Sequence, residues 1–231
     1  MNLIKLLLVF SLFIAHELAA TVSAGEPPSK LTLAVADDSQ PAASKTPTPP
    51  EGFRWDKPVA GHASKVDSGW VLRNQSGRIW AGEGNRHRLL TLKPVVSGDA
   101  LTIDVELQNA SHRYEQSGLV LHHSDDAFVK FVVEHIDGKH YVVMGQEMGS
   151  NRKVLAKILI EGSRAELRLS LKEGQAIAQW RLPAAPDDAK WREASTANYP
   201  ATKQWYFGLF SQDANPDKPG SALVRNVKLD R

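Results

Sequence analysis

The stretch from Tyr114 to Met144 constrains the fold more than any other part of the chain. Its apolar and polar residues alternate with a period of two, which is the period of side chains along a β-strand. Turn residues at 124–126 and 137–139 divide it into three strands, and the second turn contains the Asp-Gly pair typical of tight hairpins. One face of these strands is apolar and is expected to lie in a core: Leu119, Leu121, Val129, Phe131 and Val133.

The opposite face of the same strands carries polar groups: the amide, imidazole, ammonium and carboxylate of Gln116, His122, Lys130 and Glu134. If this face is concave, these groups are placed to bind sugar hydroxyls. Trp80, beside a Gly- and Asn-rich stretch, is the best candidate for an aromatic surface on which a sugar ring stacks. The alternative is a cross-strand ion pair with polar neighbours on a solvated sheet, which contributes about 0.2–1 kcal/mol.

Short β-rich runs continue along the chain at the spacing of an all-β sandwich, and no long stretch has a helical period. We expect two large antiparallel sheets packed face to face. The predicted strands are 69–74, 77–81, 87–92, 100–107, 117–123, 129–136, 140–146, 153–160, 164–172, 176–181, 205–211 and 222–229. The proline-containing segment 183–201 is expected to be the least ordered part of this domain.

The N-terminus has the pattern of an export signal. Lys5 precedes the apolar run 6–15, which is shorter than the roughly 20 residues that a membrane-spanning helix requires. Small residues suited to cleavage follow, so 1–24 is predicted to be a signal peptide and the mature chain to carry no transmembrane segment. The segment 25–50 is a Pro-rich flexible tether, and 51–231 forms one domain. The predicted location is periplasmic or secreted; an uncleaved anchor is the alternative.

Composition excludes several classes of function. The chain contains no cysteine, so disulfides, thiolate catalysis and Cys-ligated zinc are excluded. Its 28 Lys and Arg residues are scattered and nearly balanced by 26 Asp and Glu residues, which argues against a nucleic-acid partner.

Part of the chain resembles a known family. The resemblance rests on 114–122, 128–130, 133–134, Trp80, 207–210 and 222–227. These residues are similar to the characteristic stretches of an uncharacterised bacterial family often described as regulation-of-enolase-like. The resemblance spans about 69–229 and implies a concanavalin A-like jelly-roll sandwich, the lectin/glucanase fold, without implying an activity. His122 stands where that family usually has arginine.

No catalytic motif is complete. Concanavalin A-like glucanases resemble each other in a Glu-x-Asp-x-x-Glu strand, which this chain lacks. The nearest pair, Asp104 and Glu106, alternates with apolar residues and is expected on the solvated side of an ordinary strand.

Metal motifs are also incomplete. His122 and His123 are adjacent and point to opposite sides of a strand, so they do not form a zinc or copper site together. Asp213, Asn215 and Asp217 have the spacing of a calcium loop but lack its glycine and its final glutamate. We therefore predict no cofactor, with a looser structural calcium as the alternative.

These observations predict an exported, non-catalytic module that binds carbohydrate or another cell-envelope glycan. Its predicted ligand-binding residues are Gln116, His122, Lys130, Glu134 and Trp80. A glycoside hydrolase or polysaccharide lyase of the same fold with a non-standard site is the first alternative, and a structural or protein-interaction domain is the second. A groove flanked by Trp80 would favour binding, whereas two buried carboxylates in that groove would favour catalysis.

Overall fold

The computed structural model describes residues 46–80, 87–183, 190–213 and 217–231. The chain divides into two units, Met1–Gln40 and Pro41–Arg231, and every described residue belongs to the second. The predicted signal peptide and most of the predicted tether lie outside these residues. A search of the described segments found no helix with the length and hydropathy needed to cross a membrane.

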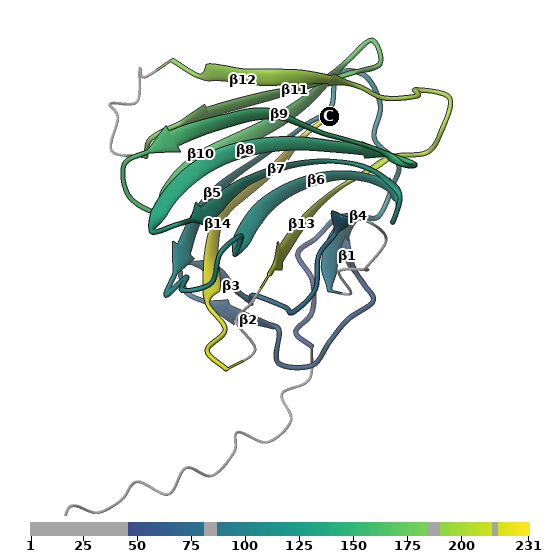
Figure 1. Ribbon diagram of the computed structural model, residues 1–231. Coiled ribbons are helices and arrows are strands. Elements are labelled where there is room, and N and C mark those ends of the chain that lie inside the picture. Colours follow the sequence, from purple (N-terminus) through teal and green to yellow (C-terminus); the bar gives the residue numbers. More distant parts are fainter. Residues whose placement is uncertain (1–45, 81–86, 184–189, 214–216) are drawn as a thin grey trace, which may run out of the picture. The chain divides into compact units, whose positions relative to one another are not determined.

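The described residues form two antiparallel sheets of seven strands each and contain no α-helix (Figure 1). The first sheet has the order β1 (Phe53–Asp56), β4 (Arg88–Thr91), β13 (Tyr206–Gln212), β6 (Gln116–Ser124), β7 (Ala127–Ile136), β8 (Lys139–Met148) and β9 (Asn151–Ile160). The second has the order β12 (Arg192–Asn198), β11 (Gln175–Arg181), β10 (Arg164–Lys172), β5 (Ala100–Gln108), β14 (Ser221–Asp230), β3 (Gly69–Arg73) and β2 (Ala63–Val66). The prediction of an all-β sandwich of two antiparallel sheets is confirmed.

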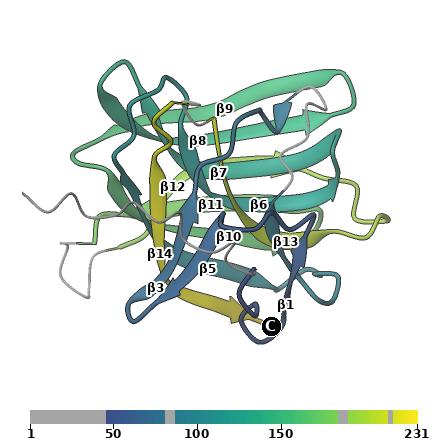
Figure 2. The ribbon, with the colours of Figure 1, turned by 90° about the horizontal axis from the view of Figure 1, so that it is seen from below.

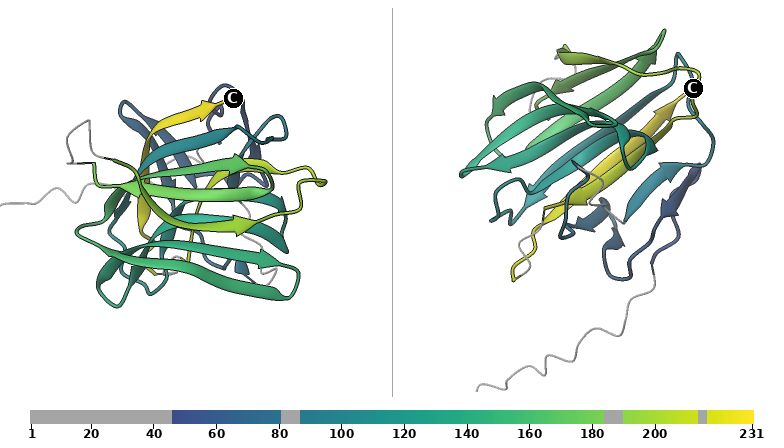
Figure 3. Two further views of the ribbon diagram at one scale, coloured as in Figure 1. Left: turned by 90° about the horizontal axis from the view of Figure 1, so that it is seen from above. Right: turned by 45° about the vertical axis from the view of Figure 1, so that its right-hand side comes forward.

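The main core lies between the two layers, which Figures 2 and 3 show from below and from above. Leu119 and Phe131 of the first sheet pack there with residues such as Leu101 and Leu167 of the second. The residues predicted to face the core are all 0% exposed: Leu119, Leu121, Val129, Phe131 and Val133. The period-two prediction for these strands is therefore confirmed.

A second hydrophobic cluster covers the opposite, outer face of the first sheet. Its buried members are Ile79, Leu90, Val120, Phe128, Val132, Val143 and Phe210, with Trp80, Tyr141 and Tyr206 packed against them. Ile79 and Trp80 come from the segment that follows β3, where the sequence predicted a strand at 77–81. Residues 77–80 form no strand, and 81 lies outside the described residues. The central strands β6 and β7 of the first sheet are thus buried on both faces.

Two hairpin turns have the conformation that their sequences predict. Asp137 and Gly138 join β7 to β8 with φ values of 50° and 77°, and Glu173 and Gly174 join β10 to β11 with 49° and 79°. Positive φ at both central residues is the geometry that matches the twist of antiparallel strands, and it favours glycine at the second position.

Three strands were missed by the sequence pattern: β1, β2 and β12. The first two have four residues each, too few to show a period. Strand β12, Arg192–Asn198, lies in the segment expected to be least ordered, so that expectation is wrong for these residues. It is an edge strand with mostly exposed side chains, and its sequence therefore lacks the apolar alternation of a half-buried strand.

The core between the sheets predicts the effect of truncating Phe131. Replacement of this fully buried ring by alanine leaves a cavity, and the free energy of unfolding in urea should fall by about 3–5 kcal/mol. Leu92→Ala is the control, because Leu92 is 56% exposed and its truncation should change stability by less than about 0.5 kcal/mol. Equal effects of the two substitutions would contradict the assignment of the core.

Candidate functional site

A cavity of about 280 Å³ lies on the outer face of the first sheet. It is lined by Arg78, Trp80, Tyr114, Gln116, Lys130, Glu134, Val143, Val154 and Asp213. We call it the β7 cavity, because strand β7 supplies Lys130 and Glu134. The structure brings together four of the predicted ligand-binding residues here: Gln116, Lys130, Glu134 and Trp80. The fifth, His122, does not line the cavity.

Strand register places the polar groups of the cavity side by side. Gln116 of β6 lies opposite Glu134 of β7, and Lys130 of β7 lies opposite Gly145 of β8. Gln116 is 1%, Lys130 2% and Glu134 5% exposed, because neighbouring groups on this face exclude water. The alternative of a solvated ion pair on an open sheet is therefore wrong.

The side-chain amide of Gln116 connects the charged groups. Its Oε1 accepts a hydrogen bond of 2.6 Å from Lys130 Nζ. Its Nε2 donates to the carbonyl oxygen of Tyr114 (3.0 Å), to Asp213 Oδ2 (3.2 Å) and, at 3.4 Å, to Glu134 Oε1. Both ends of the amide are therefore occupied by protein groups, so Gln116 positions the charges around it.

Burial dominates the electrostatics of these groups. It lowers the pKa of Lys130, against the opposing charges of Glu134 and Asp213. It raises the pKa of Glu134, and it raises the pKa of Asp213 to about 6 in spite of the Arg78 guanidinium, whose Nε lies 3.4 Å from Asp213 Oδ1. The cavity thus contains two carboxylates that hold protons more tightly than ordinary side chains.

Glu115, the neighbour of Gln116, shows what a satisfied buried carboxylate looks like. Burial alone would raise its pKa, but it accepts hydrogen bonds from the backbone N–H groups of Ser111, His112 and Gly220 and from the Asn74 amide, which together hold the pKa below its usual value. Glu115 therefore has a structural role in fastening loops. Among the described residues, Glu134 accepts one long bond, from Gln116, and it lines the cavity.

Hydrogen bonds to the end of β13 hold the segment that carries Trp80. The Ile79 N–H donates to Gln212 Oε1 (2.7 Å), and Ser211 donates to Asn74 Oδ1. These bonds fix the segment that runs from β3, in the second sheet, to the outer face of the first sheet.

A glycine makes room for the Trp80 indole. A Cβ added at Gly145 would lie 2.9 Å from the Trp80 ring and 3.1 Å from Lys130 Cε. The ring also packs on Phe128, with centroids 5.7 Å apart, and the Lys130 ammonium lies 4.9 Å from its centroid, within range of a cation–π interaction. The half-buried indole is thus a fixed aromatic wall of the cavity.

Two further lining residues have unusual backbone conformations. Tyr114 has φ = 75° and Asp213 has φ = 62°. Positive φ is uncommon for a non-glycine residue, above all for a bulky one, and such strain is concentrated at functional sites. Sequence patterns did not place Asp213 beside Gln116, because the two residues lie 97 positions apart. The alternative of a structural calcium at Asp213, Asn215 and Asp217 is not tested, since Asn215 lies outside the described residues.

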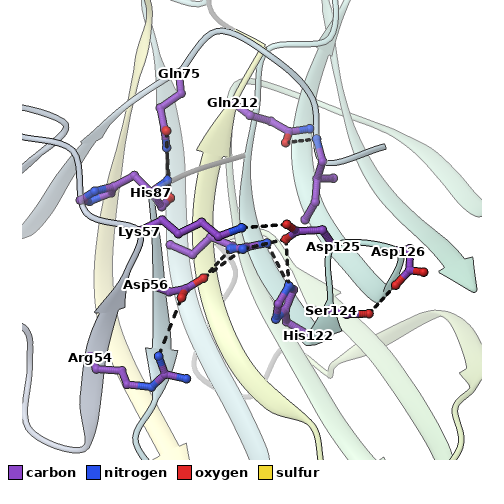
Figure 4. A network of polar contacts seen from close by, with 12 residues as sticks. Arg54, Asp56, Lys57, Gln75, His87, His122, Ser124, Asp125, Asp126 and Gln212 are labelled. Carbon is purple, nitrogen blue, oxygen red and sulfur yellow. Dashed lines mark hydrogen bonds and ion pairs between the residues drawn. The ribbon is translucent and has the colours of Figure 1, made fainter. Parts of the chain in front are cut away.

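His122 belongs to a separate network on the same sheet (Figure 4). The buried Arg88 guanidinium contacts His122 Nε2 at 2.9 Å and donates to Asp56 (2.9 Å) and Asp125 (2.8 Å). Lys57 Nζ donates to the other oxygen of Asp125 at 2.7 Å. We call this group the Arg88 network. His122 contacts Arg88 and does not line the β7 cavity, so the prediction that it shares a site with Lys130 is wrong.

The charged groups of the Arg88 network form hydrogen bonds with one another. Burial, assisted by the Arg88 charge, lowers the pKa of His122 to about 4. Burial opposes ionisation of Asp125, but hydrogen bonds from Lys57 and Arg88 lower its pKa to about 2. At neutral pH the network therefore contains a neutral imidazole and an ionised carboxylate.

Asp104 and Glu106, the two neighbouring carboxylates of β5, each form an ion pair with an arginine. Asp104, expected on a solvated face, is 2% exposed and accepts two hydrogen bonds from Arg164 (2.9 and 2.6 Å). Glu106 accepts one of 2.7 Å from Arg225. These pairs lie on the second sheet, away from the β7 cavity. In the described part of the chain, no three His, Asp or Glu residues are grouped as a metal would require.

No family model and no curated protein matches this chain. Solved structures do match it, and those described below are 10–15% identical to it. A functionally unknown protein from Saccharomyces cerevisiae is 15% identical with a TM-score of 0.61, and the match covers 79% of this chain and 98% of that one. The GH43 protein of a Bacteroides ovatus xyloglucan PUL, GH43B, is 10% identical with a TM-score of 0.61, over 83% of this chain and 41% of that one.

The GH43 protein BlXynB from Bacillus licheniformis is 10% identical with a TM-score of 0.58 over 70% of this chain. This chain spans 32% of the length of BlXynB. At such identities the likeness shows the fold alone, and it supports the sandwich of sheets.

The lowered pKa of His122 predicts a stability change in acid. The unfolded chain takes up a proton below pH 6.5, whereas folded His122 does so near pH 4, so stability is present above 6.5 and is lost as the pH falls from 6.5 to about 4. The contribution is about 3 kcal/mol. Urea unfolding of the wild type and of His122→Asn across this range should show a smaller loss in the variant; parallel curves would contradict the burial of a neutral imidazole.

Proposed function

We propose that this protein is an exported, non-catalytic module that binds a carbohydrate in the β7 cavity. One observation carries the proposal. An aromatic wall, Trp80, stands beside a buried ammonium, Lys130, and a buried carboxylate, Glu134, which accepts a single long hydrogen bond among the described residues. Sugars present polar hydroxyls around an apolar ring face, and this combination of groups suits both parts.

The comparisons support a carbohydrate-related role indirectly. Several matched chains are named as glycosidases, and BlXynB and GH43B belong to GH43. The match covers about a third of BlXynB, so the activity of that whole protein does not transfer to this chain. We also propose membership of the concanavalin A-like, regulation-of-enolase-like family, on the residues at 114–122 and 128–134 that resemble it.

Binding to an array of plant and bacterial polysaccharides, including xylan and xyloglucan, tests the proposal. Trp80→Ala and Glu134→Gln should each lower the affinity at least tenfold. Gly145→Ala should have a similar effect, because the new methyl group would lie 2.9 Å from the indole and 3.1 Å from Lys130 Cε, so that both side chains must shift. Thermal unfolding checks that each variant is folded.

The second sheet supplies matched controls. Trp191, whose ring contacts Arg181, and Glu166, which is bonded to Arg181 at 2.7 Å, lie far from the cavity in the fold. Trp191→Ala and Glu166→Gln should leave binding unchanged. Absence of binding to any glycan by the folded wild type would overturn the proposal and favour a protein-interaction role.

Catalysis is the second candidate, because a specific observation favours it. Glu134 and Asp213 are both buried, both have raised pKa values, and both contact the amide of Gln116. Carboxyl groups with raised pKa values serve as proton donors in glycoside hydrolysis, in which water adds across the broken glycosidic bond. New reducing ends in the binding assays, absent with Glu134→Gln, would establish hydrolysis in place of binding alone.

Export is the remaining part of the proposal, and the segment 1–24 carries it. Expressed at full length in a bacterial host, the chain should appear in the periplasm or medium with an N-terminus near Gly25. Deletion of the signal segment should leave it in the cytoplasm. A wild-type chain that stays cytoplasmic and uncleaved would contradict this assignment.

A further inference from the structure

We propose that the β7 cavity takes a single terminal residue of a neutral glycan, bound end-on, rather than the interior of a sugar chain. This inference rests on the proposed function and specifies its ligand. It follows from the size of the cavity, from its surroundings on the sheet, and from the balance of its charges.

The cavity has room for about one sugar unit. Its volume of about 280 Å³ is just below the range of small-molecule sites, which is about 300–1,000 Å³. A longer stretch of polysaccharide would require the site to continue along the sheet as a groove.

Next to the cavity, along the strand direction, the outer face of the sheet is covered by buried side chains. On this face Val132 lies between Lys130 and Glu134, Val120 lies opposite Lys130, and Phe128 is the next residue of β7 beyond Lys130. All three are 0% exposed within the second hydrophobic cluster. Beyond them lies the Arg88 network, with His122 opposite Phe128. Phe128 and the Arg88 network therefore occupy the path that a bound polysaccharide would take from Lys130 along these strands toward His122.

The charges of the cavity favour a neutral ligand. Lys130 and Arg78 are balanced by Glu134 and Asp213, and Arg78 is already paired with Asp213. A ligand carboxylate that approached Lys130 would be repelled by the Glu134 carboxylate, whose negative charge already stabilises the Lys130 ammonium. Removing a charged ligand from water without a net opposite charge in the site is unfavourable.

Two adjacent hydroxyl groups of a sugar match the remaining donors of Lys130 and the remaining acceptors of Glu134. An ammonium has three N–H donors, and within the described residues the bond to Gln116 uses one of those of Lys130. Within the same described residues, Glu134 accepts one long bond, and a carboxylate has about four acceptor positions. One hydroxyl accepts from Lys130, its neighbour donates to Glu134, and the apolar face of the ring lies on Trp80.

Oligosaccharide ladders test this inference on the purified full-length protein. Calorimetry with one to six residues derived from xylan, cellulose, mannan and polygalacturonate measures the affinity per chain. For a neutral ladder that binds, affinity should change less than threefold from the dimer to the hexamer, with one site per chain end, and the methyl glycoside of the terminal sugar should compete. Polygalacturonate fragments should bind at least tenfold more weakly.

Two charge variants test the preference for a neutral ligand. Glu134→Gln removes the negative charge beside Lys130, so it should reduce the preference for neutral over acidic ladders at least threefold, whereas Glu166→Gln should not. An affinity that rises tenfold or more with chain length would overturn end-on binding and leave carbohydrate binding intact. A preference for the acidic ladder would overturn the neutral class. Absence of binding to every ladder would overturn this inference, and the array then decides whether the proposed function falls with it.

Discussion

A buried ammonium group organises the candidate site. Lys130 lies on the outer face of a sheet, but it is 2% exposed, so its charge must be stabilised by protein groups. The bond of 2.6 Å to Gln116 Oε1 orients that amide, and the amide nitrogen then faces Glu134 and Asp213. One neutral side chain therefore holds an ammonium and two carboxylates around a single cavity.

Burial of both faces of the central strands β6 and β7 is the condition for this arrangement. The main core covers one face, and the second hydrophobic cluster, with Trp80 packed against it, covers much of the other. On a solvated face the same residues would form weak, screened pairs. Beside the cluster, water exclusion raises the pKa of Glu134 and lowers that of Lys130, which leaves polar groups whose bonding capacity a ligand can fill.

The two neighbouring clusters on this face differ in their hydrogen-bonding balance. In the Arg88 network, the carboxylate of Asp125 receives bonds from both Lys57 and Arg88 and ionises readily. In the β7 cavity, Glu134 receives one long bond. Charged groups that are fully paired stabilise an arrangement, whereas under-satisfied ones beside a cavity mark a binding or catalytic site.

The sequence by itself determined the central strands β6, β7 and β8, their hairpin turn at Asp137-Gly138 and the faces of their side chains, because period-two alternation and Asp-Gly geometry are local properties. It therefore identified the core face of Leu119 and Phe131 and the shared face of Gln116, Lys130 and Glu134. Trp80 was expected at the site, but only tertiary structure brings it against Lys130, adds Asp213 to the cavity and leaves His122 out of it. Those contacts join segments far apart in the chain, and the burial that shifts the pKa values exists only when the loop after β3 packs on the sheet.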